Sequence, residues 1–185
     1  TAIRLQEKKL GVDLLRNDEP SSVAVIQTAG RVVAASGVSS EAGKWTITFA
    51  DTGVSVILAV RPVQQWLEFE VLSVEGGAVD SLTFLNIPLN TRGTLDDSVA
   101  GCVLALNLTC NVTELPGPMT SLQATCYESF GLAGAKAALL VAPPSALRAV
   151  MKSVVGAAEG LPHSPLGGPW AMDAAVNRGS YLIDS

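Results

Sequence analysis

The sequence contains few charged residues, few aromatic residues and a single histidine. Charged residues make up 16% of the 185 positions and aromatic residues 5%. No apolar run reaches the roughly 18 residues that a membrane-spanning helix needs. The 12 Lys and Arg residues are outnumbered by 17 Asp and Glu residues, which gives a formal net charge of −5, whereas a nucleic-acid-binding protein is expected to show a basic patch. The composition therefore argues against nucleic acid and against a membrane as partners.

Motifs for nucleophilic catalysis and for metal sites built on histidine and cysteine are missing too. A Ser/His/Asp or Cys/His arrangement needs a histidine base, and the only histidine, His163, lies in a Pro-rich segment. The sequence contains no Gly-x-Ser-x-Gly elbow, no Walker-type phosphate loop and no Cys-x-x-Cys pair. We therefore expect no catalytic centre of these types.

The cysteines Cys102, Cys110 and Cys126 are odd in number, so they do not make a disulfide framework. A bridge between Cys102 and Cys110, or between Cys110 and Cys126, remains an alternative. We expect three small, buried, reduced thiols, because a free cysteine behaves as a small hydrophobic residue.

Calcium differs from the softer metals because its ligands are carboxylate and carbonyl oxygens. Asp96 and Asp97 in a polar loop, or Asp51 in a turn, could supply such oxygens, although no EF-hand spacing is present. We expect no cofactor, with a structural calcium ion as the open alternative.

The sequence does contain a large apolar fraction, arranged in short runs. Hydrophobic residues make up 48% of the chain, which excludes disorder and allows a domain with a sizeable core. Strand-like runs recur about every ten residues with turn signals between them, a spacing typical of sandwiches and barrels. The runs are 2–6, 9–15, 23–26, 31–35, 44–50, 54–60, 66–71, 79–89, 102–108, 122–127 and 137–141. The sequence therefore predicts an all-β fold, an antiparallel β-sandwich.

One amphipathic helix is predicted near the C-terminus, over residues 145–158. Its apolar stripe follows the i, i+3, i+4, i+7 spacing of a helix that buries one face; the stripe is Leu147, Val150, Met151, Val154, Val155 and Ala158. We expect residues 1–160 to form the β-sandwich domain with this helix. Residues 161–185, rich in Pro and Gly at their start, are expected to be an exit segment leading to a further domain.

Alternation along 66–71 places Trp66, Glu68 and Glu70 on one strand face, with Leu67, Phe69 and Val71 on the other. Carboxylates two apart on one face do not oppose each other across a cleft, as glycoside hydrolysis requires. The simpler interpretation of both carboxylates is a solvated outer face. Among the aromatic residues Trp66 is the best candidate for an exposed platform, since the apolar face of a sugar stacks on an aromatic ring.

A second concentration of aromatic and polar side chains lies near the end of the chain. Trp170 and Tyr181 accompany Asn177 and Arg178 within a dozen positions. These side chains have the composition of a sugar-binding edge. The competing interpretation is that they dock the chain onto a neighbouring domain, and we favour that interpretation for this segment.

Several runs resemble the N-terminal β-sandwich domains of large bacterial glycoside hydrolases, in which a barrel-type catalytic domain follows such a segment. The runs that carry the resemblance are Ala124–Gly131, Lys136–Leu139, Leu147–Arg148, Gly167–Ala171 and Asn177–Leu182. The resemblance implies a secreted or extracytoplasmic protein and an ancillary domain without a catalytic pair of its own.

We therefore expect a non-catalytic carbohydrate-binding domain of a polysaccharide-degrading enzyme. Its partners would be a polysaccharide or oligosaccharide and an adjacent catalytic domain in the same chain. The predicted ligand-binding residues are Trp66, Glu68, Trp170, Asn177, Arg178 and Tyr181. Two alternatives stay open: a purely structural domain that packs on a glycoside hydrolase catalytic domain, and a β-sandwich enzyme acting on polysaccharides.

Overall fold

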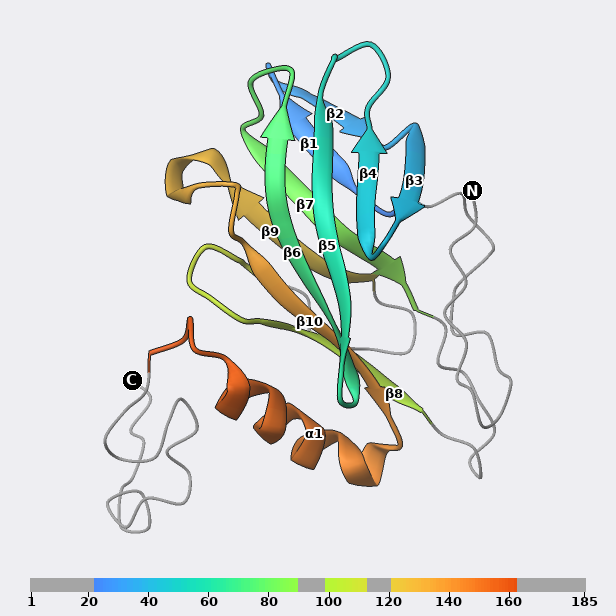
Figure 1. Ribbon diagram of the computed structural model, residues 1–185, viewed down its shortest axis with the longest axis vertical. Helices are drawn as coiled ribbons and strands as arrows, with labels where there is room; N and C mark the ends of the chain where they lie inside the picture. Colours follow the sequence, from blue (N-terminus) through green and yellow to red (C-terminus); the bar gives the residue numbers. More distant parts are fainter. Residues whose placement is uncertain (1–21, 90–98, 113–120, 163–185) are drawn as a thin grey trace, which may run out of the picture.

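The strands of the protein form two antiparallel sheets that pack face to face, as seen in a computed structural model that describes residues 22–89, 99–112 and 121–162 (Figure 1). The four-stranded sheet has the order β2-β1-β7-β9, with β1 (Val25–Thr28), β2 (Arg31–Ala34), β7 (Ser81–Pro88) and β9 (Ser121–Tyr127). The six-stranded sheet has the order β3-β4-β5-β6-β10-β8, with β3 (Gly37–Glu41), β4 (Lys44–Thr48), β5 (Ser55–Val63), β6 (Trp66–Glu75), β8 (Ala100–Ala105) and β10 (Lys136–Ala142). The predicted all-β sandwich is confirmed.

Two of the hairpins close on the same two-residue turn. Ala29 and Gly30 join β1 to β2 with φ of 48° and 73°, and Ala42 and Gly43 join β3 to β4 with φ of 48° and 76°. Two consecutive positive φ values define the type I′ turn, whose twist matches that of the flanking strands. Glycine at the second position carries this conformation without strain.

The strand β3 was not predicted, since its residues lie between the predicted strands 31–35 and 44–50. Among the described residues it pairs only with β4, at the edge of its sheet, and four of its five residues are exposed. An edge strand that buries little surface lacks the apolar alternation by which a strand is recognised in a sequence. Only its backbone pairing with β4 shows that these residues form a strand. The predicted strands 2–6 and 9–15 lie outside the described residues.

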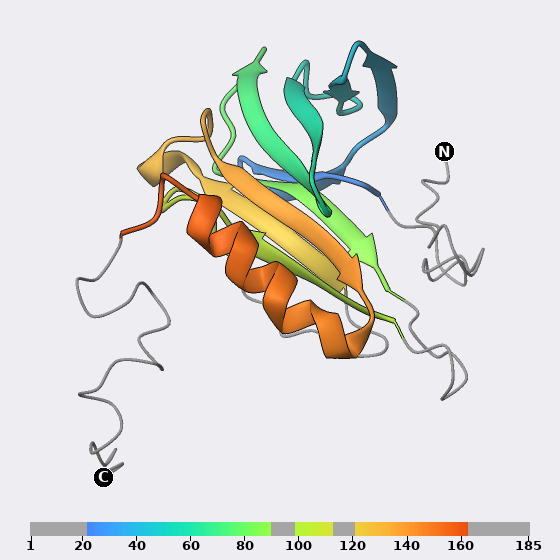
Figure 2. The same ribbon diagram turned by 60° about the horizontal axis from the view of Figure 1, so that its bottom comes forward.

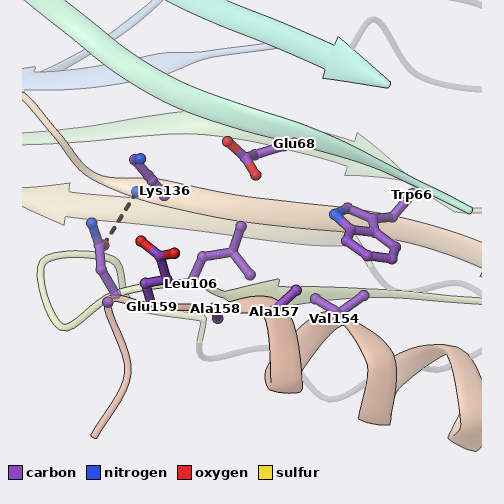
Figure 3. Close-up of a pocket in the computed structure, with 10 residues that line it drawn as sticks. Trp66, Glu68, Leu106, Lys136, Val154, Ala157, Ala158 and Glu159 are labelled. Carbon is purple, nitrogen blue, oxygen red and sulfur yellow. Dashed lines mark hydrogen bonds between the residues drawn. The ribbon is translucent and has the colours of Figure 1, made fainter. Parts of the chain in front are cut away.

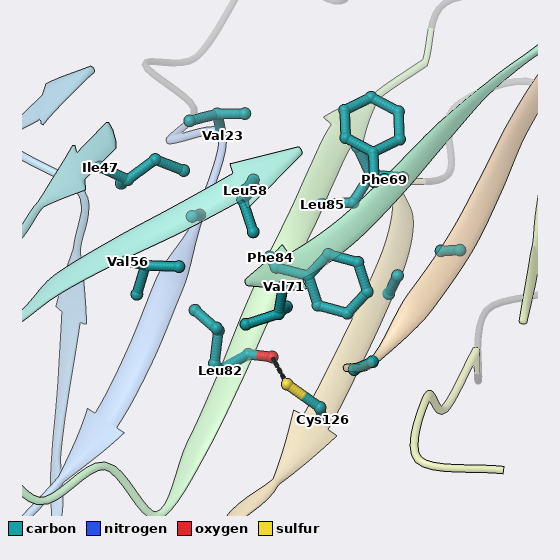
Figure 4. Close-up of a cluster of buried hydrophobic side chains, with 14 of the residues drawn as sticks. Val23, Ile47, Val56, Leu58, Phe69, Val71, Leu82, Phe84, Leu85 and Cys126 are labelled. Atoms are coloured by element: carbon teal, nitrogen blue, oxygen red, sulfur yellow. Dashed lines mark hydrogen bonds between the residues drawn. The ribbon is translucent and has the colours of Figure 1, made fainter. Parts of the chain in front are cut away.

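The main core fills the space between the sheets and is purely apolar. Figure 4 shows side chains from both sheets meeting there, including Ile47 and Phe69 from one and Leu82 and Phe84 from the other. On β7 the pairing register with β9 shifts between Thr83 and Leu85, which marks a β-bulge. The bulge explains why Phe84 and Leu85, although adjacent, are both buried.

A second, smaller core lies on the opposite face of the six-stranded sheet, beneath the helix α1 (Pro144–Ala157). Figure 2 shows α1 lying along β10 and β8, and its buried side chains come from the predicted apolar stripe. The helix begins with Pro144 at its first position, where the missing N–H leaves no bond unmade. The predicted helix is confirmed, one residue from the predicted bounds at each end. No helix in the described ranges has the length and apolar character to cross a membrane.

We expect replacement of Phe69 by alanine to remove about 3–5 kcal/mol from the free energy of unfolding. Phe69 is 2% exposed and meets Trp45 edge-on with ring centroids 5.9 Å apart, so truncation leaves a cavity in the main core. Phe130→Ala is the matched control, because that ring is 70% exposed and its loss should change stability by less than about 0.5 kcal/mol. Urea unfolding followed by circular dichroism measures both, and equal midpoints would contradict this account of the core.

Candidate functional site

A pocket of about 460 Å³ opens where α1 ends against the six-stranded sheet (Figure 3). Three parts of the chain build it: the outer face of β6 and β10, the segment that follows β8, and the last turn of α1 with the residues after it. The lining residues are Trp66, Glu68, Leu106, Asn107, Lys136, Val154, Ala157, Ala158, Glu159 and Gly160. This volume lies within the roughly 300–1,000 Å³ found for small-molecule sites.

The pocket has an apolar end and a charged end. Figure 3 shows Trp66 and Val154 together at one end, with Lys136 and Glu159 at the other and Leu106 between them. The apolar end exists because the stripe of α1 packs on the outer face of the sheet. The charged end begins where the helix stops covering that face.

Trp66 is not the exposed platform that the sequence predicted. It lies on the predicted strand face with Glu68, but α1 covers this face and leaves the residue only 7% exposed. The alternation along β6 identified the face correctly, but it could not show that a helix beginning 78 residues later, at Pro144, would cover that face. Trp66 and Glu68 do come together at the pocket, so their assignment as ligand-binding residues stays a prediction.

Charged side chains on the outer face of β5, β6 and β10 are joined in one row. Arg61 lies opposite Glu68 in the β5–β6 register and bonds to its Oε1 at 2.9 Å, and it also contacts Glu70. Lys136 lies opposite Glu70 on β10, with 3.5 Å between Nζ and Oε1. Two hydrogen bonds raise the pKa of Arg61: the bond to Glu68 has the larger effect and the bond to Glu70 the smaller. Such half-exposed pairs add little stability, but they fix the orientation of Glu68 at the pocket.

Asn107 is a structural member of the pocket wall. Its Nδ2 donates to the carbonyl of Gly134 at 2.7 Å, and its Oδ1 accepts from the backbone N–H of Lys136 at 3.2 Å and from the hydroxyl of Thr109 at 3.0 Å. The side-chain amide is thereby used to attach the segment after β8 to the start of β10. Asn107 also forms a parallel β-bridge with Gly160, which fixes the chain after α1 against the same segment.

Sequence reasoning did not identify Asn107, Lys136, Glu159 or Gly160 as neighbours of Trp66. They belong to three segments. Pairing of β10 with β6 and β8 brings Lys136 and Asn107 near Trp66, and the packing of α1 adds Glu159 and Gly160. No local spacing encodes these contacts. The break in the apolar stripe at Glu159-Gly160 was the one usable signal, because charged side chains cluster where a buried helix ends.

The other predicted site residues, Trp170, Asn177, Arg178 and Tyr181, lie outside the described residues, and so do His163, Asp96 and Asp97. Asp51, the remaining calcium candidate, has a φ of 58° in the turn between β4 and β5. Within residues 22–89, 99–112 and 121–162 no three His, Cys, Asp or Glu residues are grouped as metal ligands would be.

No family model, curated protein or solved structure matches this chain.

We expect opposite effects from alanine at two nearby glycines. A Cβ on Gly160 would lie 2.7 Å from the Cβ of Asn107 and 2.8 Å from the carbonyl oxygen of Leu106, so Gly160→Ala must displace the chain after α1. Overpacking of this kind costs about 1–3 kcal/mol. Gly156→Ala, in the last turn of α1, meets nothing within 4 Å and should add about 0.4–1 kcal/mol.

Thermal unfolding of the two variants beside the parent measures the difference. A Gly160→Ala protein as stable as Gly156→Ala would contradict the close packing of the pocket wall.

Proposed function

We propose that this chain is a non-catalytic carbohydrate-binding domain and that the pocket at the end of α1 is its binding site. The observation that supports the proposal is the pairing, in one pocket of about 460 Å³, of an indole and aliphatic surface at one end with charged side chains at the other. A saccharide has the same division, since its ring carbons present an apolar face and its hydroxyls lie around the edge.

The charges favour a neutral or amino sugar over an acidic one. The carboxylates of Glu68 and Glu159 face the pocket with a single lysine, Lys136, which is also paired with Glu70. The C-terminal end of α1 adds the negative pole of the helix dipole. Carboxylates accept hydrogen bonds from sugar hydroxyls or ammonium groups and repel a uronic acid.

The arrangement of the strand carboxylates supports binding without catalysis. Glu68 and Glu70 lie side by side on β6 and share Arg61, so these two carboxylates do not flank a bond from opposite sides. We further propose that the domain belongs to a secreted or extracytoplasmic polysaccharide-degrading enzyme and that an adjacent catalytic domain performs the chemistry.

A purely structural role on a neighbouring domain has an observation of its own in its favour. Leu108 is 76% exposed and Phe130 is 70% exposed. They belong to the turn after β8 and to the short 3-10 helix η2 (Glu128–Phe130), which lie at the same end of the sandwich (Figures 1 and 2). Exposed apolar side chains at one end of a domain suit a packing surface.

Affinity electrophoresis of the purified chain in gels containing neutral, amino-sugar or acidic polysaccharides tests the binding proposal. We expect retardation by a neutral or amino-sugar polymer and none by a polyuronate. Glu159→Gln should weaken binding about 10-fold or more, because a hydrogen bond to a charged group contributes about 1.5–3 kcal/mol. Trp66→Phe keeps an aromatic ring in the second core, so it should weaken binding less than Glu159→Gln does.

Two variants away from the pocket serve as controls. Glu128→Gln on η2 removes a charge as Glu159→Gln does, and Trp45→Phe in the main core replaces an indole as Trp66→Phe does. Both should bind as the parent does. The site assignment is wrong if Glu159→Gln and Glu128→Gln bind equally well. Absence of retardation in every gel would leave the structural role as the better account.

A further inference from the structure

The segment that follows β8 pairs briefly with β9, and this pairing sets two cysteines opposite each other. Asn111 and Thr125 form an isolated antiparallel bridge in which each backbone N–H donates to the other's carbonyl, at 2.7 and 2.9 Å. In an antiparallel ladder the next pair of residues makes no such bonds, and its Cα atoms approach to about 4.5 Å. Cys110 and Cys126 are the residues next to this isolated bridge, one on each segment.

The two thiols lie on the same, inner side of the pairing. Cys110 is 8% exposed and Cys126 is fully buried, whereas the adjacent Asn111 is exposed. Burial raises the pKa of each thiol to about 12, and for Cys110 the nearby Cys126 adds to the effect. Both thiols therefore lie in the main core, beside the one bridge that joins their two segments.

Cys102 is separated from this pair by the six-stranded sheet. It lies with Trp66 and Leu140 in the core beneath α1, whereas Cys110 and Cys126 belong to the main core. Of the two bridges that the sequence left open, Cys102–Cys110 would have to pass through the sheet. Cys110–Cys126 joins two side chains that lie in the same core and next to the same β-bridge.

We propose that Cys110 and Cys126 form an intramolecular disulfide when the chain meets a small disulfide oxidant such as oxidised glutathione. The Cys110 thiolate attacks one glutathione sulfur and releases the first glutathione thiolate. The Cys126 thiolate then attacks the Cys110 sulfur and releases the second. The two cysteines lose two electrons to the glutathione disulfide, and their two protons pass to the released thiolates or to water.

The disulfide between Cys110 and Cys126 requires little rearrangement of the fold. A directly opposed pair has a Cα separation within the range of about 4.4–6.8 Å seen in disulfides. Cys126 must rotate its sulfur away from the carbonyl oxygen of Leu82, with which it makes a weak 3.6 Å hydrogen bond (Figure 4). Because the buried thiols hold their protons, the reaction on the folded chain proceeds through local opening of the segment that carries Cys110.

The disulfide would connect the two sheets covalently. Cys110 follows β8 of the six-stranded sheet, and Cys126 lies in β9 of the four-stranded sheet. It would also anchor the segment that carries Leu106 and Asn107, so oxidation would fix that wall of the pocket.

Incubation of the folded, reduced chain with oxidised glutathione, followed by non-reducing peptide mapping with mass spectrometry, tests the proposal. We expect one cross-linked peptide pair that contains Cys110 and Cys126, with Cys102 reduced. The melting temperature should rise by about 5–10 °C, since closing a loop of this length constrains the unfolded chain. Dithiothreitol should reverse the shift.

Three variants provide the controls. Cys102→Ala should keep the cross-link and the shift, whereas Cys110→Ala and Cys126→Ala should lose both. Refolding the reduced, denatured chain in a glutathione redox buffer starts from exposed thiols. A failure of the buried thiols to react on the folded chain would therefore not by itself contradict the proposal. The proposal is overturned if refolding yields reduced thiols, glutathione adducts alone, or a bridge that includes Cys102.

Discussion

The six-stranded sheet has to bury both of its faces over β6, β10 and β8, and the rest of the structure depends on that constraint. The sequence of β10 is apolar almost without interruption, and five of its seven residues are buried. A strand of this kind needs a layer on each side. The four-stranded sheet covers one side and α1 the other (Figure 2). Shortening α1 would expose apolar surface, and lengthening it would close the pocket, so the pocket is the place where the second layer ends.

The outer face of this sheet is divided along its length into an apolar and a charged half. In a chain with only 16% charged residues, Arg61, Glu68, Glu70 and Lys136 all gather on the half that α1 leaves uncovered. Their mutual pairing compensates each charge at the edge of an apolar surface, where an unpaired ion would be costly. The amphiphilic character of the pocket thus follows from its position on the border between the two halves.

Local patterns in the sequence predicted the parts of the fold that local patterns control. Alternation along β6 gave its two faces, and the apolar stripe gave α1 within one residue at each end. The bulge in β7 at Phe84-Leu85 was not predicted and is a finding of the structure. The exposure of Trp66 was predicted wrongly because alternation identifies a face but not the layer that covers it. The pocket could not be predicted, because Asn107, Glu159 and Trp66 are brought together by packing between distant segments.

The parallel bridge between Asn107 and Gly160 holds the residues that follow α1 against the segment that follows β8. Because no side chain fits between these two backbones, Gly160 is held at the pocket, whose lining includes both residues. A unit joined through this point would experience anything bound in the pocket at a high effective concentration, set by the tether rather than by diffusion. The geometry of a single glycine contact would then control how often a bound molecule and a tethered unit meet.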